Sequence, residues 1–322
     1  MLNKGTIEDI FNVAISNGGD FVEIFVEDNF TTEVSVIGGY IEKGMNGRDF
    51  GIGIRIFNGL NSMYAYTNDL SKDNLLDITK KASTAIGKDK KDIVLSFDKP
   101  VKPSIHKYNI LPSSVELVKK VELMKRATTA AKKYSDEITQ VTVNYIDQEQ
   151  DVLIANTDGV FVEDKRVRTR MLIVVVAEQG GQLETGYVGP GASRGLEFYD
   201  TIDIEDYARE AARIAKTMVY ADYSPAGVMP VIIDNGFGGL MFHEACGHSL
   251  EASSVAKGVS IFSDKLGEKI ASDVVTLVDD GSIPNSWGSL GVDDEGKTTQ
   301  KNILIENGVL KSYMIDKLNG RR

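Results

Sequence analysis

The chain has 322 residues, of which 42% are hydrophobic and 26% are charged; this predicts a globular protein of about two domains and excludes a disordered or fibrous one. Its 36 basic and 47 acidic residues leave a net charge of −11, which argues against binding to nucleic acid. The single cysteine, Cys246, excludes an intrachain disulfide and a four-cysteine zinc site.

No segment predicts export or insertion into a membrane. Acidic residues interrupt the N-terminal sequence before an apolar run forms, so it does not resemble a signal peptide. The longest apolar stretch, Met171–Ala177, is far too short to cross a bilayer. We therefore expect a cytoplasmic protein that acts without a membrane.

The first hundred residues predict two helices with strands between them. Apolar spacing predicts a helix over Thr6–Ser16, and Ser71 is suited to cap another helix that runs to Ile86. Asn58-Gly59 predicts a hairpin turn, because both residues tolerate positive φ. The strand-like runs are Phe21–Glu27, Thr32–Ile37, Phe50–Phe57 and Met63–Tyr66.

The next part of the chain predicts a helix, a meander of strands and another helix. Ser113 and Glu116 have the spacing of a capping box before an apolar helical stripe. A second helix is expected from Ile204 to Tyr220. Between the helices, apolar residues recur at every second position. This spacing predicts strands at Thr139–Ile146, Val152–Ala155, Val160–Glu163, Arg170–Glu178 and Leu183–Val188.

A linker-like sequence, Tyr223–Gly227, marks a predicted domain boundary. After it we expect a short strand at Pro230–Ile233, a glycine-rich turn, a helix, and a C-terminal hairpin around Asn307-Gly308. The prediction is therefore a two-domain α+β protein with mostly antiparallel sheets flanked by helices. Residues 1–222 form its N-terminal domain, and residues 223–322 begin its second domain.

Two of the three histidines lie in one segment, Phe242-His-Glu-Ala-Cys-Gly-His-Ser-Leu-Glu251, on the helix expected in the second domain. They are five residues apart, whereas the histidines of a His-Glu-x-x-His zinc motif are four apart and share one helical face. On a regular helix, side chains five residues apart diverge by about 140°. For His243 and His248 to bind one ion, the helix must be distorted, and Gly247 is where the chain yields most easily.

Given that distortion, metal chemistry assigns the roles. The imidazoles of His243 and His248 suit Zn²⁺, which activates a water molecule for attack on a carbonyl group. Glu244 is placed to take the proton of that water and to pass it to the leaving amine. The alternative is a helix that carries a solvated glutamate and two partly buried histidines without a metal.

Two histidines do not complete a metal site. Glu251 is credible as a third ligand by its chemistry, whereas Cys246 is expected to be a small packed thiol. His106 lies among prolines and is expected at the surface. The residues alone do not select among the candidates for the third ligand, which are Glu251, Cys246, Asp293 and Asp294.

Two other patterns are interpreted as surface features. Gly291–Thr298 has the spacing of a P-loop, but a turn-like segment precedes it and acidic side chains would face the phosphates, so an acidic turn is favoured. Arg166, Arg168 and Arg170 alternate along one predicted strand. A solvated strand face is the favoured interpretation, and pairing with acids or with a substrate carboxylate is the alternative.

The metal motif resembles the signature of the TldD/PmbA family of metalloproteases, and of its TldD-type catalytic branch in particular. The resemblance extends over nearly the whole chain, through several motifs in the same order. These are Asn156–Gly159, the arginines 166, 168 and 170, Phe242–Ala252, Ser263–Ser272, Val278–Gly281, Asp293–Gly296 and Ile303–Leu310.

The resemblance implies a zinc-dependent peptidase that hydrolyses unstructured peptides. It implies that His243 and His248 bind Zn²⁺ and that Glu244 is the catalytic residue. It also implies a homodimer, or a heterodimer with a paralogous subunit that lacks the metal motif, in which residues 1–222 form much of the dimer interface and the substrate-tunnel wall. The alternative is a non-catalytic peptide-binding subunit or an inactive fragment of such a complex.

The family's third zinc ligand is a cysteine in a later C-terminal region, and Cys246 does not correspond to it. The resemblance thus implies that this ligand is absent from a chain ending at Arg322. We expect either a shortened form of the protein or a degenerate member of the family.

Overall fold

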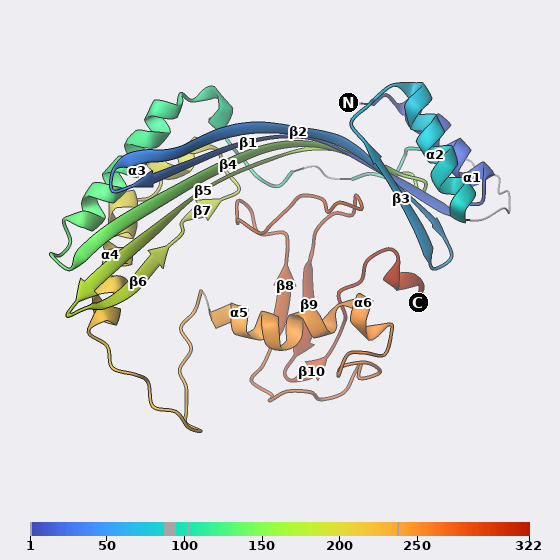
Figure 1. Cartoon of the computed structure of the whole chain (residues 1–322). Coiled ribbons are helices and arrows are strands. Elements are labelled where there is room, and N and C mark those ends of the chain that lie inside the picture. The colour runs from blue at the N-terminus through green and yellow to red at the C-terminus, as the bar shows by residue number, and fades with distance from the viewer. Residues whose placement is uncertain (1, 87–94, 102–103, 237) are drawn as a thin grey trace.

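The computed structural model of the chain describes residues 2–86, 95–101, 104–236 and 238–322. A long, strongly curved antiparallel sheet arches over the molecule, with strand order β3-β2-β1-β4-β5-β6 and β7 paired with β5 (Figure 1). Its four central strands each have 17 to 19 residues. The strands are β1 (Phe21–Ile37), β2 (Tyr40–Asn58), β3 (Asn61–Thr67), β4 (Ile138–Asn156), β5 (Phe161–Gln179), β6 (Gln182–Val188) and β7 (Gly191–Ala192).

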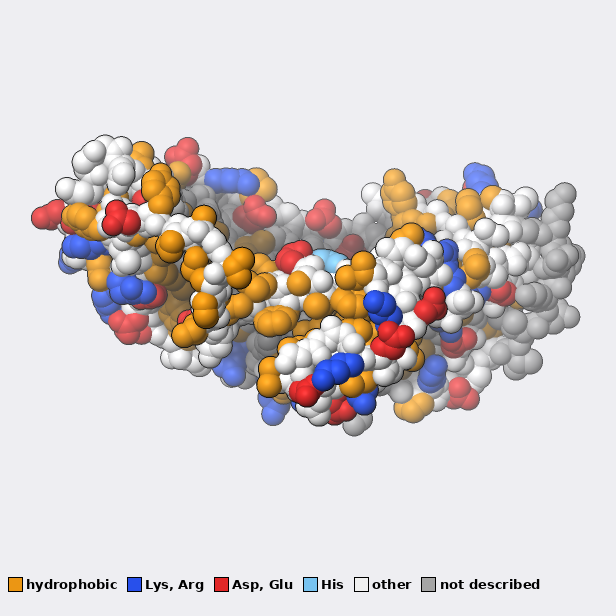
Figure 2. Space-filling view, turned by 90° about the horizontal axis from the view of Figure 1, so that it is seen from below, with side chains coloured by type: hydrophobic (Ala, Val, Ile, Leu, Met, Phe, Trp, Pro, Cys, Tyr) orange, Lys and Arg blue, Asp and Glu red, His pale blue; other side chains and the backbone are white. Residues whose placement is uncertain are grey.

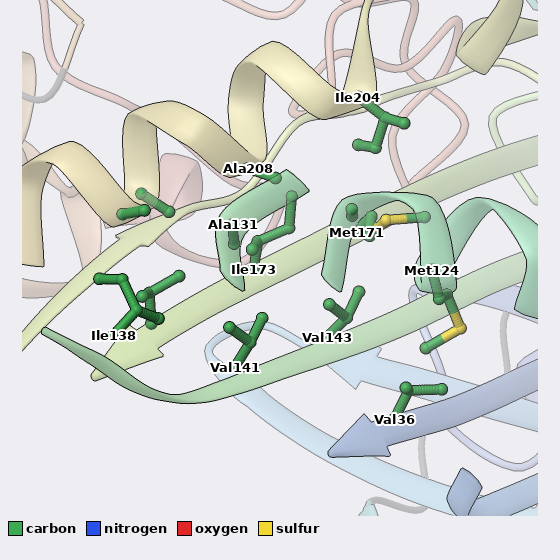
Figure 3. Close-up of a cluster of buried hydrophobic side chains, with 14 of the residues drawn as sticks. Val36, Met124, Ala131, Ile138, Val141, Val143, Met171, Ile173, Ile204 and Ala208 are labelled. Carbon is green, nitrogen blue, oxygen red and sulfur yellow. The ribbon is translucent and has the colours of Figure 1, made fainter. Parts of the chain in front are cut away.

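Four helices cover the two ends of one face of this sheet. The β1 residues that belong to the two cores covered by helices all have even numbers, so both helix pairs pack against the same face; they are Val22, Ile24, Val26, Val34 and Val36. α1 (Lys4–Ser16) and α2 (Lys72–Ile86) cover one end, and α3 (Leu117–Lys132) and α4 (Ile204–Val219) cover the other. Figure 3 shows the second of these cores, in which side chains of β4 and β5 meet those of α3 and α4.

The C-terminal part lies beneath the arch (Figure 1) and has its own small sheet, in the order β10-β9-β8. Its strands and short helices are α5 (Gly238–Phe242), α6 (Ala252–Val255), β8 (Leu277–Asp280), β9 (Lys301–Glu306) and β10 (Val309–Leu310). Its core is formed by the buried side chains of Leu250, Phe262, Leu304, Ile305 and Leu310. This small core supports the segment that carries the two histidines.

One loop of the C-terminal part, residues 281–299, docks on the inner face of the arch and is called the docking loop below. Val292 is fully buried against side chains of β4 and β5, and the flanking acids pair with arginines of the sheet. Arg166 Nη1 lies 2.8 Å from Asp294 Oδ1, and Arg55 Nη2 lies 2.7 Å from Glu295 Oε1. The loop therefore joins the two parts through an apolar contact and two ion pairs.

The α+β class and the antiparallel sheets are confirmed, but the strands are longer than predicted. The runs Phe21–Glu27 and Thr32–Ile37 are one continuous strand, β1, whose intervening residues pair with both neighbours. In β1 the gap in the apolar pattern lies between the two cores that the helices cover, where polar side chains are tolerated. The predicted runs within β4 and within β5 also merge, but there several of the intervening polar side chains are buried and paired, such as Asp147 with Lys120 of α3.

Two local predictions were wrong. Ser113 does not cap α3; its backbone N–H donates to Glu149 Oε1, and the helix begins at Leu117 without a side-chain cap. Pro230–Ile233 is not a strand, and all four residues are exposed. Within the described ranges, no helix is both long enough and apolar enough to cross a bilayer.

Candidate metal centre

The two histidines lie at the ends of a distorted helical turn. α5 continues into a π-helical turn, His243–Gly247, which a 3₁₀ turn at His248–Leu250 follows. The backbone N–H of His248 donates to the C=O of His243, five residues earlier, instead of four residues earlier as in an α-helix. The distortion predicted from the five-residue spacing is therefore confirmed.

This turn brings the two imidazoles together. The ring centroids of His243 and His248 are 4.4 Å apart, with 68° between the ring planes. One possible ligand atom each from His243, Glu244 and His248 lie within 4.8 Å of one another, and all three residues are exposed. In Figure 2 a histidine surface, in pale blue, is open to solvent near the middle of the face.

Gly247 gives the His243 ring its room. Gly247 is buried, and a Cβ added there would lie 3.4 Å from His243 Nδ1, at the short end of ordinary contact. A larger side chain at this position would press directly on the imidazole. The backbone angles of Gly247, φ −53° and ψ −60°, are ordinary helical values, so its missing side chain matters for the packing of one candidate ligand.

The donor set of this cluster fits a divalent metal ion. Two imidazole nitrogens and a carboxylate oxygen are the ligands that Zn²⁺ binds in catalytic sites, where one position stays open for water or substrate. Because the three side chains converge at an open surface, an ion bound here would face solvent. The same arrangement leaves Glu244 available as a base if the histidines alone bind the ion.

The four candidates for a third ligand do not join this cluster of described residues. Glu251 instead lies 2.8 Å from His248 Nδ1, on the side of that ring, and half-buried Cys246 packs against the small C-terminal core. Asp294 pairs with Arg166, and Asp293 Oδ1 accepts the backbone N–H groups of residues 295 and 297 at 3.0 and 2.8 Å. Both aspartates therefore stabilise the docking loop.

The prediction that His106 lies at the surface was wrong. Its side chain is buried, with Nε2 2.8 Å from the C=O of Ser289 and Nδ1 2.9 Å from the backbone N of Asn285. Burial lowers the pKa of its imidazole below the ordinary value. The proline-rich sequence around it gave no signal of this distant partner.

The favoured interpretation of the arginine row was wrong for Arg166, whereas Arg170 is exposed as predicted. Arg166 is buried and bonds to Asp294 and to the C=O of Val292, so the alternative of pairing with acids holds for this residue. Arg170 lies over the ring of Trp287, with 5.5 Å from its guanidinium carbon to the ring centroid. The acidic segment that resembled a P-loop forms the docking loop, with a strand and no helix after it.

A cleft of about 460 Å³ lies beside Glu244. Ile233, Leu240 and Met241 supply much of its apolar lining. Sequence reasoning did not identify these residues as part of a site. An apolar side chain near the start of a helix is more often part of a core, so the residue types gave no indication of a site. Only their position just before the metal motif could have indicated one.

Comparison with known proteins places this geometry in a family. Three family models match in order: PmbA/TldA metallopeptidase domain 1 at residues 22–86, the central domain at residues 110–219 and the C-terminal domain at residues 226–322. Together these models account for most of the chain, and the third contains the histidine turn.

Two curated relatives are named "Metalloprotease TldD homolog". The protein of Buchnera aphidicola subsp. Acyrthosiphon pisum is 34% identical to this chain, over 98% of this chain and 66% of the relative. The protein of Haemophilus influenzae is 33% identical, over 99% of this chain and 68% of the relative. The chain thus spans about two thirds of the length of these relatives.

Solved structures share the fold at lower identity. A Thermotoga maritima crystal structure superposes with a TM-score of 0.82 at 21% identity, over 99% of this chain and 72% of that one. TldE from Thermococcus kodakarensis superposes with a TM-score of 0.72 at 20% identity, over 98% of this chain and 71% of that one. The arch and the C-terminal part therefore occur together in other proteins.

Proposed function

The chain belongs to the TldD/PmbA family of metalloproteases, and we propose on this basis that it is a zinc-dependent peptidase. His243 and His248 would hold the ion, and Glu244 would act as general base and then as general acid. The observation that carries the proposal is the π-helical turn, which brings these three side chains together despite their irregular spacing.

When bound, zinc would supply Lewis-acid activation of water and of the peptide carbonyl group. Glu244 provides the proton transfer: its exposed carboxylate accepts a proton from the attacking water and donates it to the leaving amine. The two imidazoles would hold the ion beside this carboxylate. The cleft beside Glu244 would take an apolar side chain next to the scissile bond.

Unstructured peptides are the proposed substrates. The site is open rather than enclosed, so it suits a flexible chain that can be drawn across it. We propose that the peptide binds in an extended form by adding to a sheet edge. β2 offers such an edge, because among the described strands Tyr40–Gly51 pairs only with β1, whereas β3 pairs with β2 from Ile52 onward.

A non-catalytic peptide-binding subunit is the second candidate function. It is favoured by the ligand set, because the described cluster holds only two histidines and Glu244, which the peptidase mechanism needs as a base. Either function is compatible with the proposed assembly as a homodimer or as a heterodimer with a paralogous subunit that lacks the motif.

Hydrolysis of a flexible peptide tests the proposal. We expect zinc-dependent cleavage by the wild-type chain, and a loss of about 100-fold or more in Glu244→Gln with zinc still bound, because only the proton transfer is removed. Glu268→Gln, which alters an exposed acid outside the cluster, is the matched control. Cleavage that survives in Glu244→Gln contradicts the mechanism, and peptide binding without any cleavage supports the second function.

A further inference from the structure

One side of the His248 ring is held by a carboxylate. His248 Nδ1 lies 2.8 Å from Glu251 Oε1, three residues along the chain. An ionised carboxylate has no proton to donate, so the ring must donate from Nδ1. In a neutral imidazole this leaves the lone pair on Nε2, the only ring nitrogen then free to bind a metal ion.

Glu251 is itself fixed by contacts outside the histidine turn. The backbone N–H of Ala252 donates to the C=O of Met314 at 2.8 Å, and the N–H of Met314 donates to the C=O of Leu250 at 2.9 Å. Leu250 is fully buried in the C-terminal core. The backbone on both sides of Glu251 is therefore attached to a distant segment, which holds the carboxylate where the ring meets it.

The second oxygen of Glu251 is also engaged, since Ser253 Oγ donates to Oε2 at 3.3 Å. A carboxylate with one oxygen on an imidazole and the other on a hydroxyl is in the position of an outer partner of a metal ligand. Among the described residues it also falls outside the group whose ligand atoms converge. The geometry therefore separates Glu251 from the ligands, although its residue type would allow it to be one.

We propose that Glu251 is a positioning residue that sets the tautomer and orientation of His248 and so presents Nε2 to the metal ion. The proposal rests on the proposed metal site, and it assigns Glu251 no contact with the ion or with substrate. Removal of an outer carboxylate typically weakens metal binding by about 10- to 100-fold. The side chains of His248 and Glu251 are 57% and 44% exposed, so water competes for this bond and we expect the lower end, about tenfold.

The first test reads the tautomer without any metal. The chain has only three histidines, so ¹⁵N NMR of its imidazoles in the metal-free protein at about pH 8.5 gives few signals to assign. We expect His248 to carry its proton on Nδ1 in the wild-type chain and in Glu251→Gln, whose amide oxygen can still accept. In Glu251→Ala and in Glu251→Asp, whose carboxylate is one methylene shorter, we expect the proton to move to Nε2.

The second test measures metal binding by competition with a chelator, and the visible spectrum of bound Co²⁺. We expect about tenfold weaker binding in Glu251→Ala and Glu251→Asp, near wild-type binding in Glu251→Gln, and an unchanged spectral shape throughout, with Glu268→Ala as the control. A ligand role instead predicts an altered spectrum in every variant at position 251.

Two outcomes overturn the proposal: a His248 tautomer that does not respond to Glu251, and a spectrum that changes when Glu251 is replaced. Thermal unfolding of the metal-free variants establishes that each is folded, and Glu251→Asp preserves the backbone best if the alanine variant fails. If the wild-type chain binds no metal, the proposed function fails, but the NMR experiment still decides the role of Glu251.

Discussion

His106 joins the two parts of the molecule through both of its ring nitrogens. Nδ1 accepts the backbone N–H of Asn285, so Nε2 must carry the proton that is donated to the C=O of Ser289. Both bonds require a neutral ring, because a proton on Nδ1 would point at another donor. Burial lowers the pKa of the imidazole, which favours this neutral form.

A pH dependence follows at this residue. The pKa of His106 lies below its ordinary value of about 6.5 in the folded chain and near that value in the unfolded chain, so between the two pKa values the unfolded state binds more protons. The stability contributed by His106 is therefore complete above about pH 6.5 and is lost as the pH falls through this window. We expect a smaller loss in His106→Gln.

Urea unfolding of both proteins between about pH 5 and pH 8 measures this contribution as a difference in the free energy of unfolding. The difference removes the titration of other buried groups, such as Glu23, whose pKa is raised, chiefly by burial. With both proteins metal-free, His243→Ala, which removes an exposed ring, is the control. A wild-type minus His106→Gln difference that stays constant with pH would refute the assignment.

Among the secondary-structure elements, the histidine turn shows most clearly what local sequence can reveal. The spacing of His243 and His248 predicted a distortion, because an ideal helix separates side chains five residues apart and only an extra residue in the turn brings them together. The partner of His248 was not predictable in the same way. Glu251 is held by pairing with Met314, a contact between residues far apart in sequence.

The same limit applies to the sheet and to the docking loop. The apolar alternation of β1 predicted its two ends but not its polar middle, which is stabilised by pairing with β2 and β4. The burial of Arg166 could not be predicted either, because its partner Asp294 is far away in the sequence. The spacing of apolar residues and the residues of turns thus predict helices and strands, whereas partners far away in the sequence decide which charged residues are buried.

Substitution of Gly247 tests how the histidine turn packs against the His243 ring. A Cβ there would lie 3.4 Å from His243 Nδ1, so we expect Gly247→Ala to bind zinc within a few-fold of the wild type. Gly247→Val adds methyl groups against the ring and restricts the π-turn, so we expect zinc binding at least about tenfold weaker. Gly239→Val is the control, because nothing lies near a Cβ at Gly239. Equal affinities of the alanine and valine variants would contradict the packing argument.

At the scale of the whole molecule, the docking loop connects the C-terminal part to the arch. The pair of Arg166 and Asp294 is asymmetric, because the arginine side chain is 7% exposed and the aspartate side chain 67% exposed. Arg166 also bonds to the C=O of Val292 and lies near buried Asp164, so more than one contact depends on it.

We therefore expect Arg166→Gln to lower the free energy of unfolding by about 3 kcal/mol, since it leaves the buried carboxylate of Asp164 without its cation. Asp294→Asn should cost less, about 1 kcal/mol, because its amide oxygen can still accept from Arg166 Nη1 and the buried guanidinium keeps the C=O of Val292 and the carboxylate of Asp164 as partners. Urea unfolding measures both, and limited proteolysis of residues 281–299 reports the release of the loop. Lys43→Gln, which removes the exposed ion pair of Lys43 with Glu33, is the control. Equal costs at positions 166 and 294 would be inconsistent with this asymmetry.

The proposed metal centre depends on the π-helical turn that brings His243 and His248 together. Elemental analysis of zinc per chain, after gel filtration without chelator, tests it most directly. We predict about one zinc ion per wild-type chain, and almost none in the His243→Ala/His248→Ala double variant. A wild-type ratio near zero, or a ratio near one that survives in the double variant, would contradict the assignment of the metal site to this turn.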